Sequence, residues 1–183
     1  MTEHVVVATE LRVAEEGGGR TLTGIAVPYG EHTDRVAILN GEMFRPGAFK
    51  RNLMNMNRAG RYPKLRQMHD QRSAAVGTIK SLIETPEGLM VEARLADTED
   101  GNRAPQMVRE GIYDGFSVGF VAVREARGVN GVREIVEARM AELSLVEEPA
   151  YLGAKIVDIR KQRQAAIVLP PMPKVDLSRG FLL

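Results

Sequence analysis

The chain has 183 residues, of which 44% are hydrophobic and 27% charged, and its formal net charge is +1. These values are ordinary for a globular domain with a core of its own, and the near-neutral charge favours neither nucleic acid nor an anionic membrane as a partner. The absence of cysteine excludes disulfides, thiolate nucleophiles and zinc sites with cysteine ligands. The first residues resemble neither a signal peptide nor a membrane span, so we expect an intracellular soluble protein.

Strand patterns dominate the first half of the chain. β-Branched residues at 5–13 and 21–27, on either side of Gly17-Gly18-Gly19, predict an opening hairpin. A short strand is expected at 36–39, before the turn dipeptide Asn40-Gly41. A helix is expected over 44–58, with Pro46 in its first turn. Further strands are expected at 64–69, 76–84 and 89–95, the last two joined by a turn at 85–88.

The second half begins with a helix expected over 98–111, with acidic residues in its first turn. Two long strands follow at 116–126 and 134–146, and a short one at 154–159. Eight or nine strands and two helices predict a mainly β fold with flanking helices, arranged as a closed or partly closed β-barrel. We expect one domain over 1–160 and a basic, proline-containing, extended C-terminal tail over 161–183.

No phosphate loop, dinucleotide fingerprint or metal-binding motif occurs in the sequence, so we expect no cofactor and no metal. The acidic residues Asp97, Glu99 and Asp100 are interpreted as a capped, solvated helix start rather than as metal ligands.

The most informative segment is Gly115-Phe116-Ser117-Val118-Gly119-Phe120. Alternation along a strand places Phe116, Val118 and Phe120 on one face and the two small residues Ser117 and Gly119 on the other. A face of small residues lets another backbone approach closely. Ser117 is therefore either an inert small residue or a nucleophile beside a substrate groove.

A serine hydroxyl needs a neighbouring base to become a useful nucleophile. His69 follows a strand at the edge of a turn, and it is the natural base if Ser117 is catalytic; the alternative is an ordinary turn histidine. Glu142 and Ser144 share one face of an otherwise apolar strand. A carboxylate there would orient and stabilise an imidazole, although an exposed structural glutamate is the alternative interpretation.

Five sequence blocks follow one another between Gly24 and Ile156. They are Gly-Ile-Ala-Val-Pro-Tyr at 24–29, Phe-Arg-Pro-Gly-Ala-Phe at 44–49, Met-His-Asp at 68–70 with Val-Gly at 76–77, the serine segment 115–120, and Ala-Glu-Leu-Ser-Leu-Val at 141–146 with Pro-Ala at 149–150. In this order they resemble the prohead (procapsid maturation) proteases of tailed bacteriophages, of the HK97 type, which share a fold with the herpesvirus assemblins.

The resemblance implies a serine endopeptidase with Ser117 as nucleophile and His69 as general base. It places Glu142 in the orienting role, with Ser144 as the rival and Asp70 as a weaker one. Gly115 and Gly119 are expected to keep the substrate groove open for an extended peptide.

The implied substrates and partners are the major capsid protein precursor and the scaffold segment. The resemblance leaves open whether the protein also pairs as a homodimer. The enzyme would act in the bacterial host cytoplasm, inside the assembling procapsid, and its own tail is a further candidate substrate. The alternative function is that of a catalytically inactive structural barrel subunit of a phage capsid or tail-tube assembly.

Overall fold

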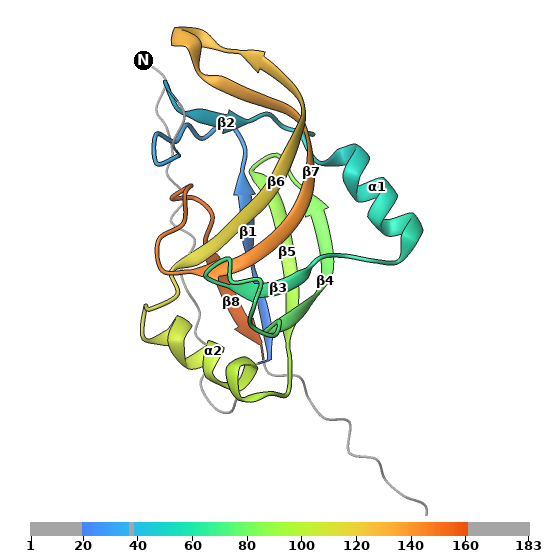
Figure 1. The fold of residues 1–183 in the computed structure, drawn as a ribbon, viewed down its shortest axis with the longest axis vertical. Coiled ribbons are helices and arrows are strands. Elements are labelled where there is room, and N and C mark those ends of the chain that lie inside the picture. The colour runs from blue at the N-terminus through green and yellow to red at the C-terminus, as the bar shows by residue number, and fades with distance from the viewer. Residues whose placement is uncertain (1–19, 37–38, 161–183) are drawn as a thin grey trace, which may run out of the picture.

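The structure is a computed structural model, and it describes residues 20–36 and 39–160. Eight strands form one sheet. Figure 1 shows that the sheet is twisted and that the helices lie outside it. The elements in chain order are β1 (Thr21–Pro28), β2 (Glu42–Phe44), α1 (Lys50–Ala59), β3 (Lys64–Gln67), β4 (Gly77–Glu84), β5 (Gly88–Leu95), α2 (Glu99–Arg109), β6 (Gly115–Arg127), the 3₁₀ turn η1 (Val129–Gly131), β7 (Arg133–Val146) and β8 (Ile156–Arg160).

The sheet has the strand order β2-β7-β3-β4-β5-β1-β8, and β6 pairs along the length of β7. Strands β2 and β3 run parallel to β7, at different positions along it, whereas the other pairs are antiparallel. The described strands do not close into a continuous ladder. An isolated bridge between Gly115 and Lys155 instead links the start of β6 to the residues before β8. The mainly β fold with two helices is confirmed, while the sheet itself stays open.

The core contains apolar side chains from the strands of the sheet and from α1. Phe44 lies at its centre, with ring centroids 5.4 Å from Phe49, 4.7 Å from Phe120 and 5.5 Å from Tyr151. Leu53 is the residue through which α1 is buried. These contacts fix β2, the start of α1 and the middle of β6 to one another, and they hold the sheet rigid around the strands that carry the candidate site.

Most predicted strands occur within one or two residues of their expected positions, but two boundaries near the N-terminus were wrong. Phe44 does not begin a helix: it pairs with Ile135 in β2. The chain then turns through Gly47, whose φ is +84°, and α1 starts only at Lys50. Of the short strand expected at 36–39, residues 37 and 38 lie outside the described residues, and residues 36 and 39 are not in a strand; the next described strand is β2, after the Asn40-Gly41 turn.

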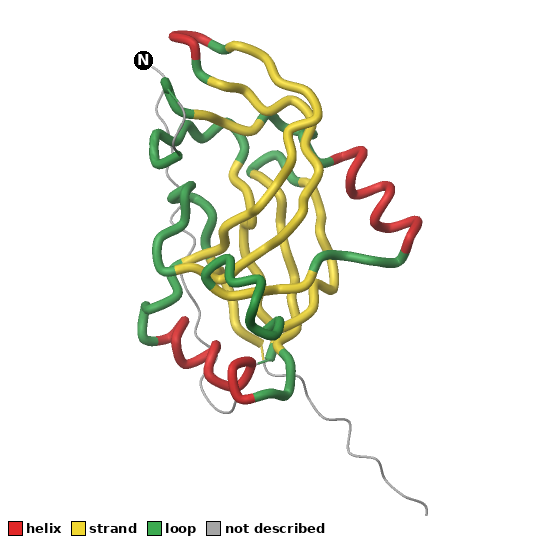
Figure 2. Tube along the Cα trace, viewed as in Figure 1, coloured by secondary structure: helices red, strands yellow, loops and turns green. Residues whose placement is uncertain are grey.

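The strand expected over 64–69 ends two residues early, because Met68 and His69 both have positive φ. The strand expected at 5–13 and the tail over 161–183 lie outside the described residues. Figure 2 shows that helix is confined to short segments at the periphery of the sheet. None of the described helices is long and apolar enough to span a membrane.

Candidate active site

The candidate site lies on three adjacent strands, with β7 between β3 and β6. Ser117 on β6 pairs with Ser144 on β7, and Ser144 pairs in turn with Arg66 on β3. Directly paired residues of antiparallel strands point to the same face, with Cβ atoms about 4.5–5.5 Å apart. Ser117 and Ser144 therefore share a face. One residue along, Phe116 and Leu145 are fully buried in the core, so the predicted alternation of this segment is confirmed.

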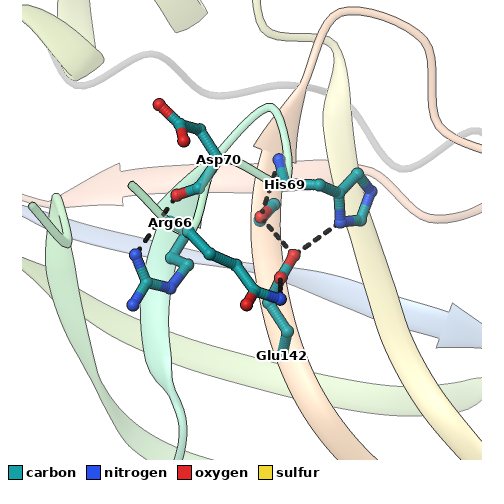
Figure 3. Close-up of polar contacts among 6 residues, drawn as sticks. Arg66, His69, Asp70 and Glu142 are labelled. Carbon is teal, nitrogen blue, oxygen red and sulfur yellow. Dashed lines mark hydrogen bonds and ion pairs between the residues drawn. The ribbon is translucent and has the colours of Figure 1, made fainter. Parts of the chain in front are cut away.

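Glu142 and His69 are in direct contact. His69 Nδ1 lies 2.5 Å from Glu142 Oε1, and the same oxygen accepts a hydrogen bond of 2.8 Å from Ser144 Oγ. Gln71 Nε2 approaches the second carboxylate oxygen at 3.4 Å. Figure 3 shows the Glu142 carboxylate at the centre of these contacts, facing the ring of His69. The structure thus brings together Glu142 and Ser144 from β7 and His69 from the turn after β3.

Exposure differs sharply between the two partners. The His69 side chain is 44% exposed, whereas that of Glu142 is 10% exposed. Within the described residues His69 Nε2 makes no hydrogen bond. With Nδ1 held by the carboxylate, Nε2 is the nitrogen left to exchange a proton with another group. This pair has the arrangement of a general base and its orienting carboxylate.

The environment of Glu142 keeps its side chain ionised. Partial burial raises the pKa of this carboxyl, but the hydrogen bonds from Ser144 and His69, the charge of His69 and the contact with Gln71 together lower it below the ordinary value of 4.5. A carboxylate that stays charged stabilises the imidazolium form of the ring beside it. Glu142 is therefore a buried group with three hydrogen-bonding neighbours, rather than the exposed structural glutamate of the alternative interpretation.

His69 lies in a strained turn directly after β3. Met68 and His69 have φ values of 49° and 57°, in the left-handed region that residues other than glycine rarely adopt. The Met68 N–H donates to the Leu145 carbonyl at 2.8 Å, and the Asp70 N–H donates to the Gln67 carbonyl at 2.9 Å. Such strain persists only where surrounding contacts hold it, and it is common at functional sites.

Arg66 holds the following loop in place. Its guanidinium donates to the carbonyl oxygen of Asp70 at 3.2 Å (Figure 3) and to that of Ser73 at 3.0 Å. Neither Arg66 nor Gln71 stood out in the sequence. The only signal for Arg66 was its position three residues before His69 in the strand expected over 64–69, and Gln71 had no signal because its contact depends on how the turn folds.

The Asp70 carboxylate is turned away from His69 (Figure 3). It accepts hydrogen bonds from the Arg72 N–H at 2.8 Å and from Ser73 Oγ. The Ser73 hydroxyl, followed by the Arg72 N–H, lowers the pKa of this carboxyl. Asp70 therefore stabilises its own turn, and its contacts do not include the imidazole.

The remaining sequence candidates lie on β6. Ser117 is half-buried, and within the described residues no hydrogen bond joins its hydroxyl to His69. Gly119 lies opposite Glu142, where a Cβ would stand 3.3 Å from that of the glutamate. Gly115 is buried, and a Cβ there would lie 2.0 Å from the carbonyl oxygen of Ala154. Both glycines therefore have a packing role in the protein itself.

No group of three or more histidine, aspartate or glutamate side chains in residues 20–36 and 39–160 is arranged to hold a metal ion. The chemistry that the described side chains offer is proton transfer through His69 and Glu142 next to a strand that carries a serine. An imidazole oriented by a buried carboxylate is the kind of base that serine hydrolases use to activate a hydroxyl.

The chain belongs to the caudovirus prohead serine protease family, whose model matches residues 8–167. It is thus a serine peptidase with a role in procapsid maturation. Among solved structures, it is similar to the bacteriophage T4 capsid assembly protease, with 12% identity and a TM-score of 0.47, over 73% of this chain and 100% of that one. A comparison with curated proteins finds no match.

Proposed function

We propose that Ser117, His69 and Glu142 form the catalytic triad with which this protease cleaves the major capsid protein precursor and the scaffold segment. The observation that carries the proposal is the 2.5 Å contact between His69 Nδ1 and the buried Glu142, one strand away from Ser117. That contact fixes one ring nitrogen and leaves the other free to accept the serine proton.

The reaction proceeds by acyl transfer. His69 Nε2 takes the proton of Ser117 Oγ as the oxygen attacks the scissile carbonyl carbon. The protonated ring, stabilised by the Glu142 carboxylate, then gives that proton to the departing amine, which leaves Ser117 as an ester. A water molecule, deprotonated by the same nitrogen, hydrolyses the ester and restores the serine hydroxyl. Each proton taken by His69 is returned within the cycle.

The substrate binds as an extended strand along the outer edge of β6. The Phe116 N–H donates to the Ala154 carbonyl on this edge, so alternation presents the backbone groups of Val118 on the same side. After Phe116, no described strand pairs with this edge. An added peptide strand would therefore hydrogen-bond to β6 beside Ser117, with Gly119 leaving the groove unobstructed.

Further assignments follow from the resemblance given above. We assign the protein to the HK97 type and its fold to the partly closed barrel of the herpesvirus assemblins, with residues 1–160 as the protease domain. The same proposal holds that the protease acts inside the assembling procapsid, in the host cytoplasm, and that it pairs as a homodimer. The link between Gly115 and Lys155, which brings the start of β6 to the segment before β8, supports the partly closed barrel.

The test compares Ser117→Ala with the wild type, using a fluorophosphonate probe and a co-expressed capsid precursor. In the probe reaction Ser117 Oγ forms a bond to phosphorus, fluoride leaves and His69 takes the proton. We expect Ser117→Ala to abolish labelling and to lower cleavage by about 10⁶-fold. The control is Ser81→Ala, which removes a half-buried strand serine from β4 and is expected to retain both activities. Cleavage by Ser117→Ala at the wild-type rate would overturn the proposal.

A further inference from the structure

We propose that Ser144 is a positioning residue that joins the backbone of His69 to the carboxylate of Glu142. This inference rests on the proposed triad and adds a fourth residue to it. The side chain of Ser144 is fully buried, so it does not reach substrate itself. Its hydroxyl acts only through the two residues that it contacts.

The three residues form a closed ring of hydrogen bonds. The His69 N–H donates to Ser144 Oγ at 3.3 Å, and Ser144 Oγ donates to Glu142 Oε1 at 2.8 Å. The same carboxylate oxygen accepts from His69 Nδ1 at 2.5 Å, which completes the ring. The imidazole of His69 contacts the Glu142 oxygen directly, and the backbone of His69 is linked to the same oxygen through Ser144. These two links limit how far the imidazole can rotate.

The strand geometry explains why a side chain is needed at this point. Parallel pairing of β3 with β7 ends at Gln67 and Leu145, and the Met68 N–H makes the next bond to the Leu145 carbonyl. The left-handed turn then directs the His69 N–H back toward β7, where the partner is Ser144 Oγ rather than a backbone carbonyl. Without this hydroxyl the N–H would lose its partner, and the strained turn would lose one of the contacts that hold it.

The hydroxyl proton also determines what Ser144 can do. A serine hydroxyl has one proton to donate, and here Glu142 receives it. Ser144 therefore acts as a donor to the carboxylate and does not compete with Ser117 as a nucleophile. The same donation lowers the pKa of Glu142 against the effect of burial. Loss of the hydroxyl should raise that pKa, which a merely structural role would not do.

The experiment measures the pH profile of fluorophosphonate labelling at Ser117 for Ser144→Ala, with Ser81→Ala as the matched control. We expect Ser144→Ala to slow labelling by up to about 100-fold, because a misplaced imidazole loses that much. We also expect the acid limb of the profile, which reports proton uptake by the coupled pair of His69 and Glu142, to move to higher pH, since the carboxylate has lost a donor that stabilises its charged form. Thermal unfolding and circular dichroism establish that each variant is folded.

A second pair separates the hydroxyl from the volume of the side chain. Ser144→Thr and Ser144→Val add similar bulk at this buried position, but only threonine keeps a hydroxyl. We expect the threonine variant to label at least ten-fold faster than the valine variant, with the acid limb close to that of the wild type.

Equal labelling rates for the threonine and valine variants would overturn the role of Ser144. So would a Ser144→Ala labelling rate that falls only in proportion to the loss of folded protein, with no shift of the acid limb. Either result leaves the triad standing if Ser117→Ala and His69→Ala both abolish labelling. Persistent labelling of Ser117→Ala would instead refute the proposed triad on which this role depends.

Discussion

Glu142 shows how a charged residue is retained in an apolar strand. Leu143 and Leu145, which follow it in β7, face the core, whereas its own side chain lies on the opposite face, where Ser144, His69 and Gln71 supply hydrogen bonds. Burial without these donors would favour the neutral acid. The donors reverse that effect, so the pKa of Glu142 is lowered and the carboxylate remains charged beside the imidazole. This charge is the property that catalysis would use.

Replacing Glu142 by glutamine tests this residue against Asp70, the acidic residue next to His69 in the sequence. Glu142→Gln keeps the shape but removes the charge, and we expect it to lower capsid-precursor cleavage by about 10⁴-fold. Asp70→Asn makes the same change three residues along the loop from Gln67, where the carboxylate contacts only Arg72 and Ser73 among the described residues. We expect it to lower cleavage by less than about ten-fold, as for a residue outside the reaction. Similar losses for the two variants would show that Glu142 has no special role.

The sequence alone predicted the positions of some of these site residues. The period-two alternation correctly placed Ser117 on one face and put Glu142 with Ser144, because pairing with β6 is regular over these residues. It failed at Ala141, where a bulge in β7 leaves the side chain exposed instead of on the face of Leu143. The contacts of Gln71 and the direction of the Asp70 carboxylate could not be predicted. Both depend on the left-handed backbone at Met68 and His69, for which neither residue type has a preference.

The loop that follows β3 is the element that presents His69. Its backbone has few partners in the sheet, so its shape depends on side chains: Arg66 contacts the carbonyls of Asp70 and Ser73, and Asp70 accepts from Arg72 and Ser73. The sequence predicted a strand through this segment because its residues alternate. Tertiary contacts stop the strand at Gln67, and the same contacts set the position of the base.

Arg66→Gln should loosen this loop without unfolding the sheet. A glutamine is too short to reach both carbonyl oxygens, so we expect faster amide hydrogen exchange across 69–73 and a cleavage rate lowered by about ten-fold or more. Exchange in β4 and β5 should be unchanged. Lys64→Gln is the control, because it removes an exposed positive charge from the same strand. Loop exchange equal to that of the wild type in Arg66→Gln would rule out the supporting role of the guanidinium.

Over the whole molecule, the candidate site depends on how the ends of an open sheet are brought together. Strands β6 and β8 are not adjacent in the ladder, yet the Gly115–Lys155 bridge and the bond from the Phe116 N–H to Ala154 connect them. Strand propensities predicted seven of the eight described strands, all but β2. They could not predict this join, because it depends on the absence of a side chain at one position, where a Cβ would lie 2.0 Å from a carbonyl oxygen.

Two glycine variants on one strand separate this join from the site itself. In Gly115→Ala the new methyl group would push β6 away from Ala154, and we expect the free energy of unfolding to fall by about 1–3 kcal/mol. In Gly119→Ala the nearest atoms to the methyl group all belong to Glu142, the closest being its Cβ at 3.3 Å, so the fold should tolerate it.

Urea denaturation and fluorophosphonate labelling of the two proteins provide the measurements. We expect Gly119→Ala to unfold near the wild-type midpoint but to label more slowly, because the Glu142 carboxylate is displaced from His69. Gly115→Ala should lose stability first, and its labelling per folded molecule should fall less. The reverse pattern, with Gly115→Ala stable and inactive, would mean that this glycine serves the substrate groove rather than the closure of the sheet.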